Sequence, residues 1–488
     1  MHLRLNSRVP RLNFWQLFLL MVAAPTILAL LGVISALFQP DKDILSHLVK
    51  YVLPTAISNT LWLVIGVALI TTLLGVGLAW LTAVCEFPLR GFFVWALILP
   101  MAIPSYVMAF SLVGLFEYTG PVQALLRDFF GSSAWFPSIY SYGGVVMALS
   151  FALYPYTYMM ARNAFQTQGR RSLEAGQSLG FSIKKSFWKV SLPIARPWII
   201  GGTLLVIMET LSDFGAVAVF NYDTLTSAIY KSWFDLYSLP AALQVASVLL
   251  VFVVVITLLE RHSRSAQRFS QSRSIVLADQ RIHLSVVNRW LALLFCSLVF
   301  IAAFLLPCLR LLWWAAPHLD LVMTGRFWSY IVGSVTLALI AMVLITGLAL
   351  LTAFAARTDN SRFSAIAVRI STLGYAVPGT VLAVGLFAPI ALFDQWLAGS
   401  GVTAPLLQGT LVVMMLAYSV RFMAVAFTPL ENNLLRITPS IDAAAKSLGV
   451  SGLNMLAKVH IPMLRGGVAT AMILVFVDVM KELPITLM

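Results

Sequence analysis

Long apolar runs separated by short polar connections follow one another along the whole chain. Apolar stretches of about 18 residues or more are long enough to cross the hydrocarbon core of a bilayer as α-helices. The pattern therefore predicts an all-α polytopic membrane protein. Its eleven expected spans are residues 15–38, 60–83, 91–117, 142–165, 198–220, 241–259, 290–315, 329–356, 366–393, 404–427 and 466–488.

The composition supports this prediction. Hydrophobic residues make up 60% of the chain and charged residues 10%, whereas soluble domains carry about 25% charged residues. The net charge is +13, but no basic run is interleaved with aromatic residues as nucleic-acid sites require, so we expect no nucleic-acid partner. The first apolar segment is too long for the core of a signal peptide, and we expect it to remain as the first helix.

The Lys and Arg residues gather in alternate connections. With the N-terminus in the cytoplasm, 25 of the 32 lie on the cytoplasmic side, when basic residues at segment ends, such as Arg421, are counted with the adjoining connection. Membrane proteins concentrate Lys and Arg in cytoplasmic loops. The sequence therefore predicts a cytoplasmic N-terminus. Residues 261–289, the most polar stretch, are expected to form a cytoplasmic linker.

Two parts of the chain repeat each other, at an offset of 269 over most of the unit and of 274 in the third span. Six spans separate equivalent points, so both copies have the same orientation, and parallel repeats place a pathway at their interface. We expect two domains of six helices each, 1–260 and 290–488. The matching positions are Leu179-Gly180 with Leu448-Gly449, Val190 with Val459, Pro193 with Pro462, Glu209 with Asp478, Asp213 with Glu482, and Ala102-x-Pro104 with Ala376-x-Pro378.

The second copy contains no counterpart of residues 220–260, because Met488 aligns with Val219. The twelfth helix is therefore missing from this chain. We expect the full gene product to extend about 40 residues past Met488 and to supply that span.

A helical hairpin is predicted between the fourth and fifth spans of each copy. In both copies a short run of good helix formers ends at Leu-Gly, and nine residues separate this glycine from a Val-x-x-Pro sequence. A glycine that adopts the left-handed conformation ends the first helix, and the second is expected to stop before the proline. One such hairpin would be an ordinary surface connection, but two with identical spacing indicate a docking element.

The two hairpins resemble the EAA loop of permease subunits of ATP-binding-cassette importers. In that family the loop reads EAA, three residues, G, nine residues and I-x-LP, and it seats in a groove of the ATPase subunit. Departures from the pattern are Gly176 for the second alanine, Ala443 for the glutamate, and Ile461 for the leucine. The residues that the resemblance assigns to ATPase docking are Glu174, Ala175, Gly180, Asp442, Ala443, Ala444 and Gly449.

Four carboxylates lie inside apolar segments. Glu209 and Asp213 are four residues apart and are expected to share one helix face, and Asp478 and Glu482 repeat this spacing. Charges at membrane depth are costly and normally face a cavity or a partner. Either the four acids line a pathway that attracts a cationic solute, or they pair with neighbouring helices, where Lys481 would neutralise one of them.

The segments around these acids are similar to those of ferric-iron permeases, in which two permease domains are fused in one chain. The similar segments are Met208–Gly215 and Lys481–Pro484, and the resemblance covers essentially all 488 residues. It implies a bacterial inner-membrane permease that translocates ferric iron delivered by a periplasmic binding protein. Fused permeases for thiamine, phosphonate or polyamine share the architecture. An ion-driven secondary transporter is the alternative from another class, but it would not need two matched hairpins.

Motifs for catalysis or metal binding are not found in the sequence. No G-x-x-x-x-G-K-[ST] loop is present, so a partner must hydrolyse ATP, and the six histidines have no metal-ligand spacing. The cysteines Cys85, Cys296 and Cys308 form no CxxC pair. Pro104 and Pro378 are interpreted as kinks inside spans. We expect a non-enzymatic subunit without a cofactor, whose partners are two copies of an ATP-binding subunit, a periplasmic binding protein and membrane lipid.

Overall fold

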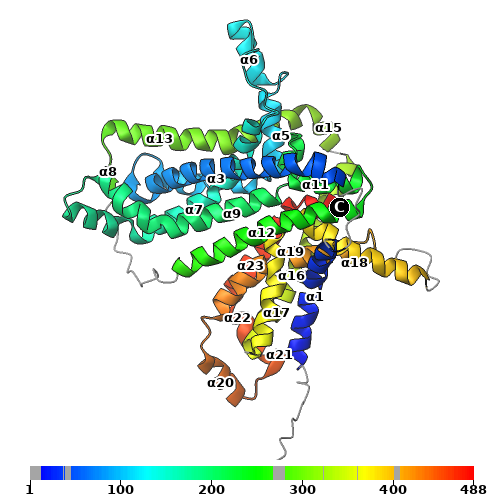
Figure 1. The fold of residues 1–488 in the computed structure, drawn as a ribbon. Coiled ribbons are helices and arrows are strands. Elements are labelled where there is room, and N and C mark those ends of the chain that lie inside the picture. Colours follow the sequence, from blue (N-terminus) through cyan, green and yellow to red (C-terminus); the bar gives the residue numbers. More distant parts are fainter. Residues whose placement is uncertain are drawn as a thin grey trace, which may run out of the picture. The chain divides into compact units, whose positions relative to one another are not determined.

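The computed structural model describes residues 13–36, 38, 46–267, 281–322, 324–359, 361–399 and 407–487. Within these ranges the regular secondary structure is helical apart from two strands of two residues each (Figure 1). Among the described residues nine helices are long and apolar enough to cross a membrane, and the number is eleven if each of two sharply bent helix pairs is counted as one span. Each of the eleven apolar segments overlaps one of them, which confirms an all-α polytopic membrane protein.

The helices pack into two compact units, Pro40–Thr324 and Met1–Gln39 with Gly325–Met488. The first unit contains η1 (Leu48–Val52), α3 (Leu53–Val84), β1 (Cys85–Glu86), α4 (Arg90–Ala96), η2 (Leu99–Ala102), α5 (Ser105–Phe116), α6 (Pro121–Phe130), α7 (Tyr142–Ser178), α8 (Ile183–Ser186), η3 (Phe187–Ser191), α9 (Leu192–Ser212), α10 (Gly215–Val219), α11 (Leu225–Phe234), α12 (Leu239–Gln267), β2 (Ile282–His283), α13 (Val286–Phe300), η5 (Ile301–Leu305), α14 (Leu306–Ala315), η6 (Ala316–His318) and α15 (Leu319–Val322).

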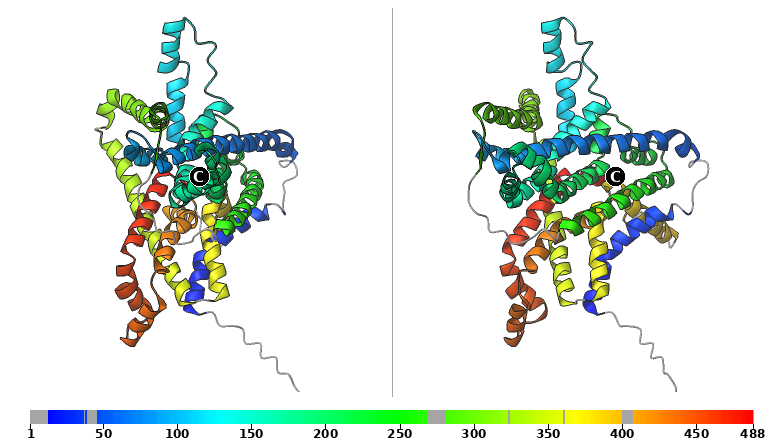
Figure 2. Two further views of the ribbon diagram at one scale, coloured as in Figure 1. Left: turned by 90° about the vertical axis from the view of Figure 1, so that its left-hand side faces the viewer. Right: turned by 60° about the vertical axis from the view of Figure 1, so that its left-hand side comes forward.

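The other unit contains α1 (Phe14–Ser35), α16 (Gly325–Thr358), α17 (Arg362–Thr372), η7 (Leu373–Ala376), α18 (Gly379–Gly399), α19 (Leu411–Leu434), α20 (Pro439–Ser447), α21 (Gly452–Met455), η8 (Leu456–His460), α22 (Ile461–Met463), α23 (Arg465–Lys481) and α24 (Pro484–Leu487). In this unit α16, α19 and α23 pack against one another (Figure 2).

The two packing units do not coincide with the two sequence repeats, because the first span of each repeat packs with the helices of the other repeat. Helix α1 packs on α18 and α17. Gly32 and Gly385 meet at the crossing with α18, where a Cβ on Gly385 would lie 2.5 Å from the carbonyl oxygen of Ala29. Small residues allow helix backbones to approach this closely in a membrane. The packing units therefore do not coincide with the predicted domains 1–260 and 290–488.

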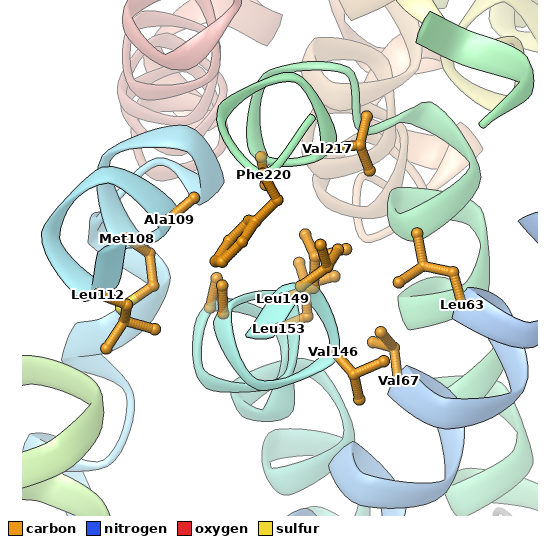
Figure 3. Packing of buried hydrophobic residues seen from close by; sticks show 14 of the residues in the cluster. Leu63, Val67, Met108, Ala109, Leu112, Val146, Leu149, Leu153, Val217 and Phe220 are labelled. Atoms are coloured by element: carbon orange, nitrogen blue, oxygen red, sulfur yellow. The ribbon is translucent and has the colours of Figure 1, made fainter. Parts of the chain in front are cut away.

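Helices α3, α7 and α9 form the centre of the unit Pro40–Thr324, with α12 packed on α9. Figure 3 shows one of its hydrophobic clusters, in which Leu149 and Leu153 of α7 lie between α3, α5 and the end of α10. A second cluster joins Phe93 and Leu97 to Cys296 and Val299 of α13. The seventh span is therefore packed into the core of the first half.

The third span of each half is broken where a kink was predicted. In the first half η2 ends at Ala102, Pro104 is the N-cap of α5, and the helix axes on the two sides of the break differ by 95°. In the second half η7 ends at Ala376 and α18 begins at Gly379, after Pro378. Both prolines thus stand before a new helix, where their missing N–H groups leave no helical hydrogen bond unmade.

Of the predicted linker 261–289, residues 268–280 lie outside the described residues. Helix α12 continues to Gln267, and β2 at the other end pairs in parallel with β1. Arg281 forms an ion pair of 3.0 Å with Glu86 beside this bridge. The linker is therefore attached to the connection that follows the second span.

Candidate functional site

The first hairpin is formed by the end of α7, α8 and η3. Gly180 has a φ of +78°. Its N–H donates to the carbonyl oxygen of Gln177 (2.8 Å), and the N–H of Phe181 donates to that of Gly176 (3.0 Å). These two bonds make a Schellman ending, which satisfies carbonyl groups that a helix end leaves free. The left-handed glycine predicted from the sequence is confirmed.

The second hairpin repeats this geometry in α20, α21 and η8. Gly449 has a φ of +77° and donates to the carbonyl oxygen of Lys446 (3.0 Å). The N–H of Val450 donates to the carbonyl oxygen of Ala445 (2.9 Å). The π-helical turns that follow, η3 and η8, also lie at equivalent positions, 269 residues apart. The two copies thus share one backbone design at the predicted docking element.

The sequence predicted that the second helix of each hairpin would stop before its proline. In both copies the helix continues past it. In the first copy the helix continues from Ile183 to Ser212. In the π-helical turn Leu192 donates to the carbonyl oxygen of Phe187, and Pro193, which has no N–H, takes an early position of α9. In the second copy the helix passes Pro462 and breaks after Met463.

Both hairpins expose an apolar tip. The leucine before each left-handed glycine is exposed, Leu179 to 71% and Leu448 to 82%. Glu174 and Ala175 in the first hairpin and Ala443 and Ala444 in the second are exposed as well. By contrast, Gly176 and its counterpart Ala445 are buried. The predicted docking residues therefore lie on the accessible face of each hairpin, with the exception of the half-buried Asp442.

Asp442 is held inside the second hairpin. Its carboxylate accepts a hydrogen bond from Arg357 Nε (2.8 Å) and another from His460 Nε2 (2.9 Å). Burial acts to raise the pKa of this carboxyl group, but the bonds from Arg357 and His460 outweigh it, so the pKa lies below its ordinary value. Arg357 also donates to the carbonyl oxygens of Leu434 (2.9 Å) and Ile437 (2.8 Å).

The intramembrane acids of the first copy do not share one helix face. Helix α9 ends at Ser212, and Asp213 has extended backbone geometry. One carboxylate oxygen accepts from the N–H groups of Ala216 (2.9 Å) and Val217 (3.3 Å), and the other accepts from the hydroxyl of Ser105. Asp213 therefore connects the end of the fifth span to the start of α5. Glu209 lies within α9 and is partly buried.

The second copy repeats this junction with a longer side chain. Glu482 follows the end of α23, and its carboxylate accepts from the N–H of Ile485 (3.4 Å), which is equivalent to Ala216. Arg421 Nε forms an ion pair with Glu482 (3.1 Å), and both side chains are at most 9% exposed. Asp478 lies within α23, so the second acidic pair does not share a face either.

Arg421 had been counted with a cytoplasmic connection, but it lies inside α19. It supplies a positive partner of Glu482 that was not predicted from the sequence. The guanidinium group of Arg421 also donates a hydrogen bond to the carbonyl oxygen of Val377 (2.7 Å). This carbonyl group is freed at the break of the third span. An arginine in the middle of an apolar segment was the available signal, because such a charge needs a buried partner.

Comparisons with known proteins agree with this architecture. Residues 72–268 match the family model described as "Binding-protein-dependent transport system inner membrane component". The chain is 27% identical to the Fe(3+)-transport system permease protein FbpB 2 of Haemophilus influenzae, over 88% of this chain and 80% of the relative. It is 27% identical to the molybdenum transport system permease protein ModB of Escherichia coli, over 38% of this chain and 80% of the relative. Against the sulfate transport system permease protein CysT of Salmonella typhimurium, identity is 29% over 36% of this chain and 64% of the relative.

Proposed function

We propose, from the match of residues 72–268 to the family model of binding-protein-dependent inner membrane components, that the chain forms the whole membrane pathway of an ATP-driven importer. Its two repeats, 1–260 and 290–488, supply the two permease domains. Two copies of an ATP-binding subunit would bind the cytoplasmic face, and a periplasmic binding protein would deliver the solute. The N-terminus is placed in the cytoplasm, in keeping with the distribution of Lys and Arg.

The matched geometry of the two hairpins carries this proposal. Each ends its first helix with the same pair of Schellman bonds, and each continues into a π-helical turn at the same position. A connection without a partner has no need for the same shape twice, nor for a largely exposed leucine at its tip. We therefore assign ATPase docking to the exposed residues of the motif, Glu174, Ala175, Gly180, Ala443, Ala444 and Gly449.

Co-purification of the ATP-binding subunit tests the docking assignment. Gly180→Val and Gly449→Val place a β-branched residue at a φ near +77°, which costs about 1 kcal/mol or more. An added Cβ meets no neighbouring atom at either glycine, so only the backbone conformation is disturbed. We expect each variant to lose most of the ATP-binding subunit while accumulating normally in the membrane.

Gly91→Val is the matched control. Gly91 also has open space around an added Cβ, but it lies in α4 with a helical backbone. The control should retain the ATP-binding subunit. Retention of wild-type amounts by both hairpin variants would refute the docking assignment.

Ferric iron is the solute that we propose. The relative with the longest match reported above is named as an Fe(3+) permease, and Glu209 and Asp478 place carboxylates at equivalent positions within the fifth span of each repeat. Such negative groups favour a cation. Molybdate and sulfate, which the names of the shorter relatives specify, are anions, and carboxylates would repel them.

Uptake into vesicles that contain the complete importer tests the solute. The double variant Glu209→Gln with Asp478→Asn removes one charge from the fifth span of each repeat and keeps the shape of both side chains. We expect labelled ferric iron to enter several-fold more slowly per molecule of permease, and Glu117→Gln, outside the fifth span, to transport normally. Unchanged uptake by the double variant would refute the pathway assignment. Uptake of labelled molybdate or sulfate in place of iron would refute the proposed solute.

A further inference from the structure

The second docking hairpin is attached to the rest of its unit by an ionic cluster. In the second hairpin, Asp442 lies between Arg357 of α16 and His460 of η8. At the offset of 269, the first copy has Leu173 in place of Asp442 and Ser191 in place of His460. The residue equivalent to Arg357 is Ala83 at one offset and Pro88 at the other. None of these residues is charged, so the equivalent positions of the first copy cannot form the same ionic cluster.

We propose that Arg357, Asp442 and His460 form an ionic clamp that sets the orientation of the second docking hairpin. Asp442 is accordingly a positioning residue and not a contact of the ATP-binding subunit. The inference rests on the proposed docking function of the hairpins, and it distinguishes Asp442 from the exposed Ala443 and Ala444 beside it. Movement of this hairpin would be passed to α16 through Arg357.

The clamp joins four elements through one carboxylate and one guanidinium group. Asp442 belongs to the first helix of the hairpin, and His460 to its second helix. Arg357 stands one residue before the end of α16, and its other two nitrogens donate to carbonyl groups at and just after the end of α19. Hydrogen bonds between ionised partners are about twice as strong as neutral ones. The clamp therefore holds both helices of the hairpin against the ends of two spans.

The burial of the three side chains supports a fixed clamp rather than a loose surface pair. His460 is 1% exposed and packs beside Phe354, with ring centroids 5.6 Å apart. The side chains of Arg357 and Asp442 are 18% and 21% exposed. Water screens such a cluster less than it screens an exposed ion pair. In the first hairpin Gly176 of α7 packs directly on Ser186 of α8.

Hydrogen–deuterium exchange of the complete chain in lipid nanodiscs tests the clamp itself. Asp442→Asn keeps the shape of the side chain and removes its charge. We expect the amides of residues 439–463 to exchange about tenfold faster, which corresponds to about 1.4 kcal/mol of local stability. The first hairpin, residues 174–192, is the control in the same molecule and should be unchanged. Asp442→Glu restores the carboxylate and should restore most of the protection.

Retention of the ATP-binding subunit tests the positioning role. The Asp442→Asn variant should lose ATP-binding subunit several-fold, and Arg357→Lys, which keeps the charge but not the planar set of donors, should show a smaller loss. Unchanged exchange in residues 439–463 would overturn the clamp. Faster exchange with full retention would overturn its positioning role. Failure of the docking function itself would be recognised separately, because Gly180→Val and Gly449→Val would then also retain the ATP-binding subunit.

Discussion

The ion pair between Arg421 and Glu482 should be the most sensitive point of the unit that contains α16 to α24. Their side chains are 9% and 7% exposed, and the Nε–Oε2 distance is 3.1 Å. Removing one member of a buried pair leaves an uncompensated charge and typically costs about 3–5 kcal/mol. Arg421→Met additionally frees the carbonyl oxygen of Val377, which adds about 1 kcal/mol. We therefore expect the free energy of unfolding to fall by about 4–6 kcal/mol.

A double-mutant cycle separates the ion pair from the individual side chains. Glu482→Gln alone leaves the Arg421 guanidinium without a negative partner, and we expect a loss of about 3 kcal/mol. The double variant Arg421→Met with Glu482→Gln contains no buried charge at this site. It should be more stable than the sum of the single losses by about 1.5–3 kcal/mol. Unfolding in mixed micelles with increasing denaturant, followed by tryptophan fluorescence, measures the free energy of unfolding of the two single variants and the double variant.

Asp213→Asn is the matched control in the first copy. Ala152 occupies the position equivalent to Arg421, and the asparagine oxygen keeps the bonds from Ala216 and Val217. The loss should therefore stay below about 1.5 kcal/mol. Strictly additive losses at Arg421 and Glu482, or an equally large loss at Asp213, would refute the reasoning.

Three further predictions concern local contacts. Gly176→Ala places a Cβ 2.8 Å from Ser186 Cβ, so it should destabilise the first hairpin by about 1–3 kcal/mol, measured by limited proteolysis between α7 and α9. Ser105→Ala removes a donor to Asp213 and should lower stability by about 1–2 kcal/mol, measured by thermal unfolding. Because the pKa of Asp442 is lowered by folding, its contribution is complete above about pH 3.9 and is lost as the pH falls further. The exchange protection of the second hairpin should therefore fall as the pH is lowered below about 3.9, and Asp442→Asn should abolish this pH dependence.

Hydropathy predicted the spans because helices that face lipid must carry long apolar sequences. The repeat and the left-handed glycines were predictable for a similar reason, since Gly180 and Gly449 each end a helix in a conformation that other residues rarely adopt. These features depend on a residue and its close neighbours in sequence. They are therefore visible without knowledge of the tertiary structure.

The predictions that failed concerned features that local sequence does not determine, namely where a helix ends and which distant residue a side chain contacts. The spacing of Glu209 and Asp213 implies a common face only if the helix continues, and α9 ends between them. Pro193 was expected to end a helix, but the preceding π-helical turn accommodates it. Arg421 was assigned to a connection because its partner, Glu482, lies 61 residues away in the sequence.

The carboxylate at the end of the fifth span is kept in both copies, although its surroundings differ. In the first copy the short side chain of Asp213 reaches the hydroxyl of Ser105, the first residue of α5. In the second copy the equivalent position is Gly379, where a Cβ would lie 2.6 Å from Glu482 Oε1. The longer acid thus occupies the space that the missing side chain leaves. Each acid lies at the N-terminus of the helix that follows the break in the third span, α5 or α18, where the helix dipole favours a negative charge. Both copies therefore require a negative group that joins the ends of two helices. Asp213 is matched to Ser105 and Glu482 to Gly379, so exchanging either acid alone would disrupt its contact.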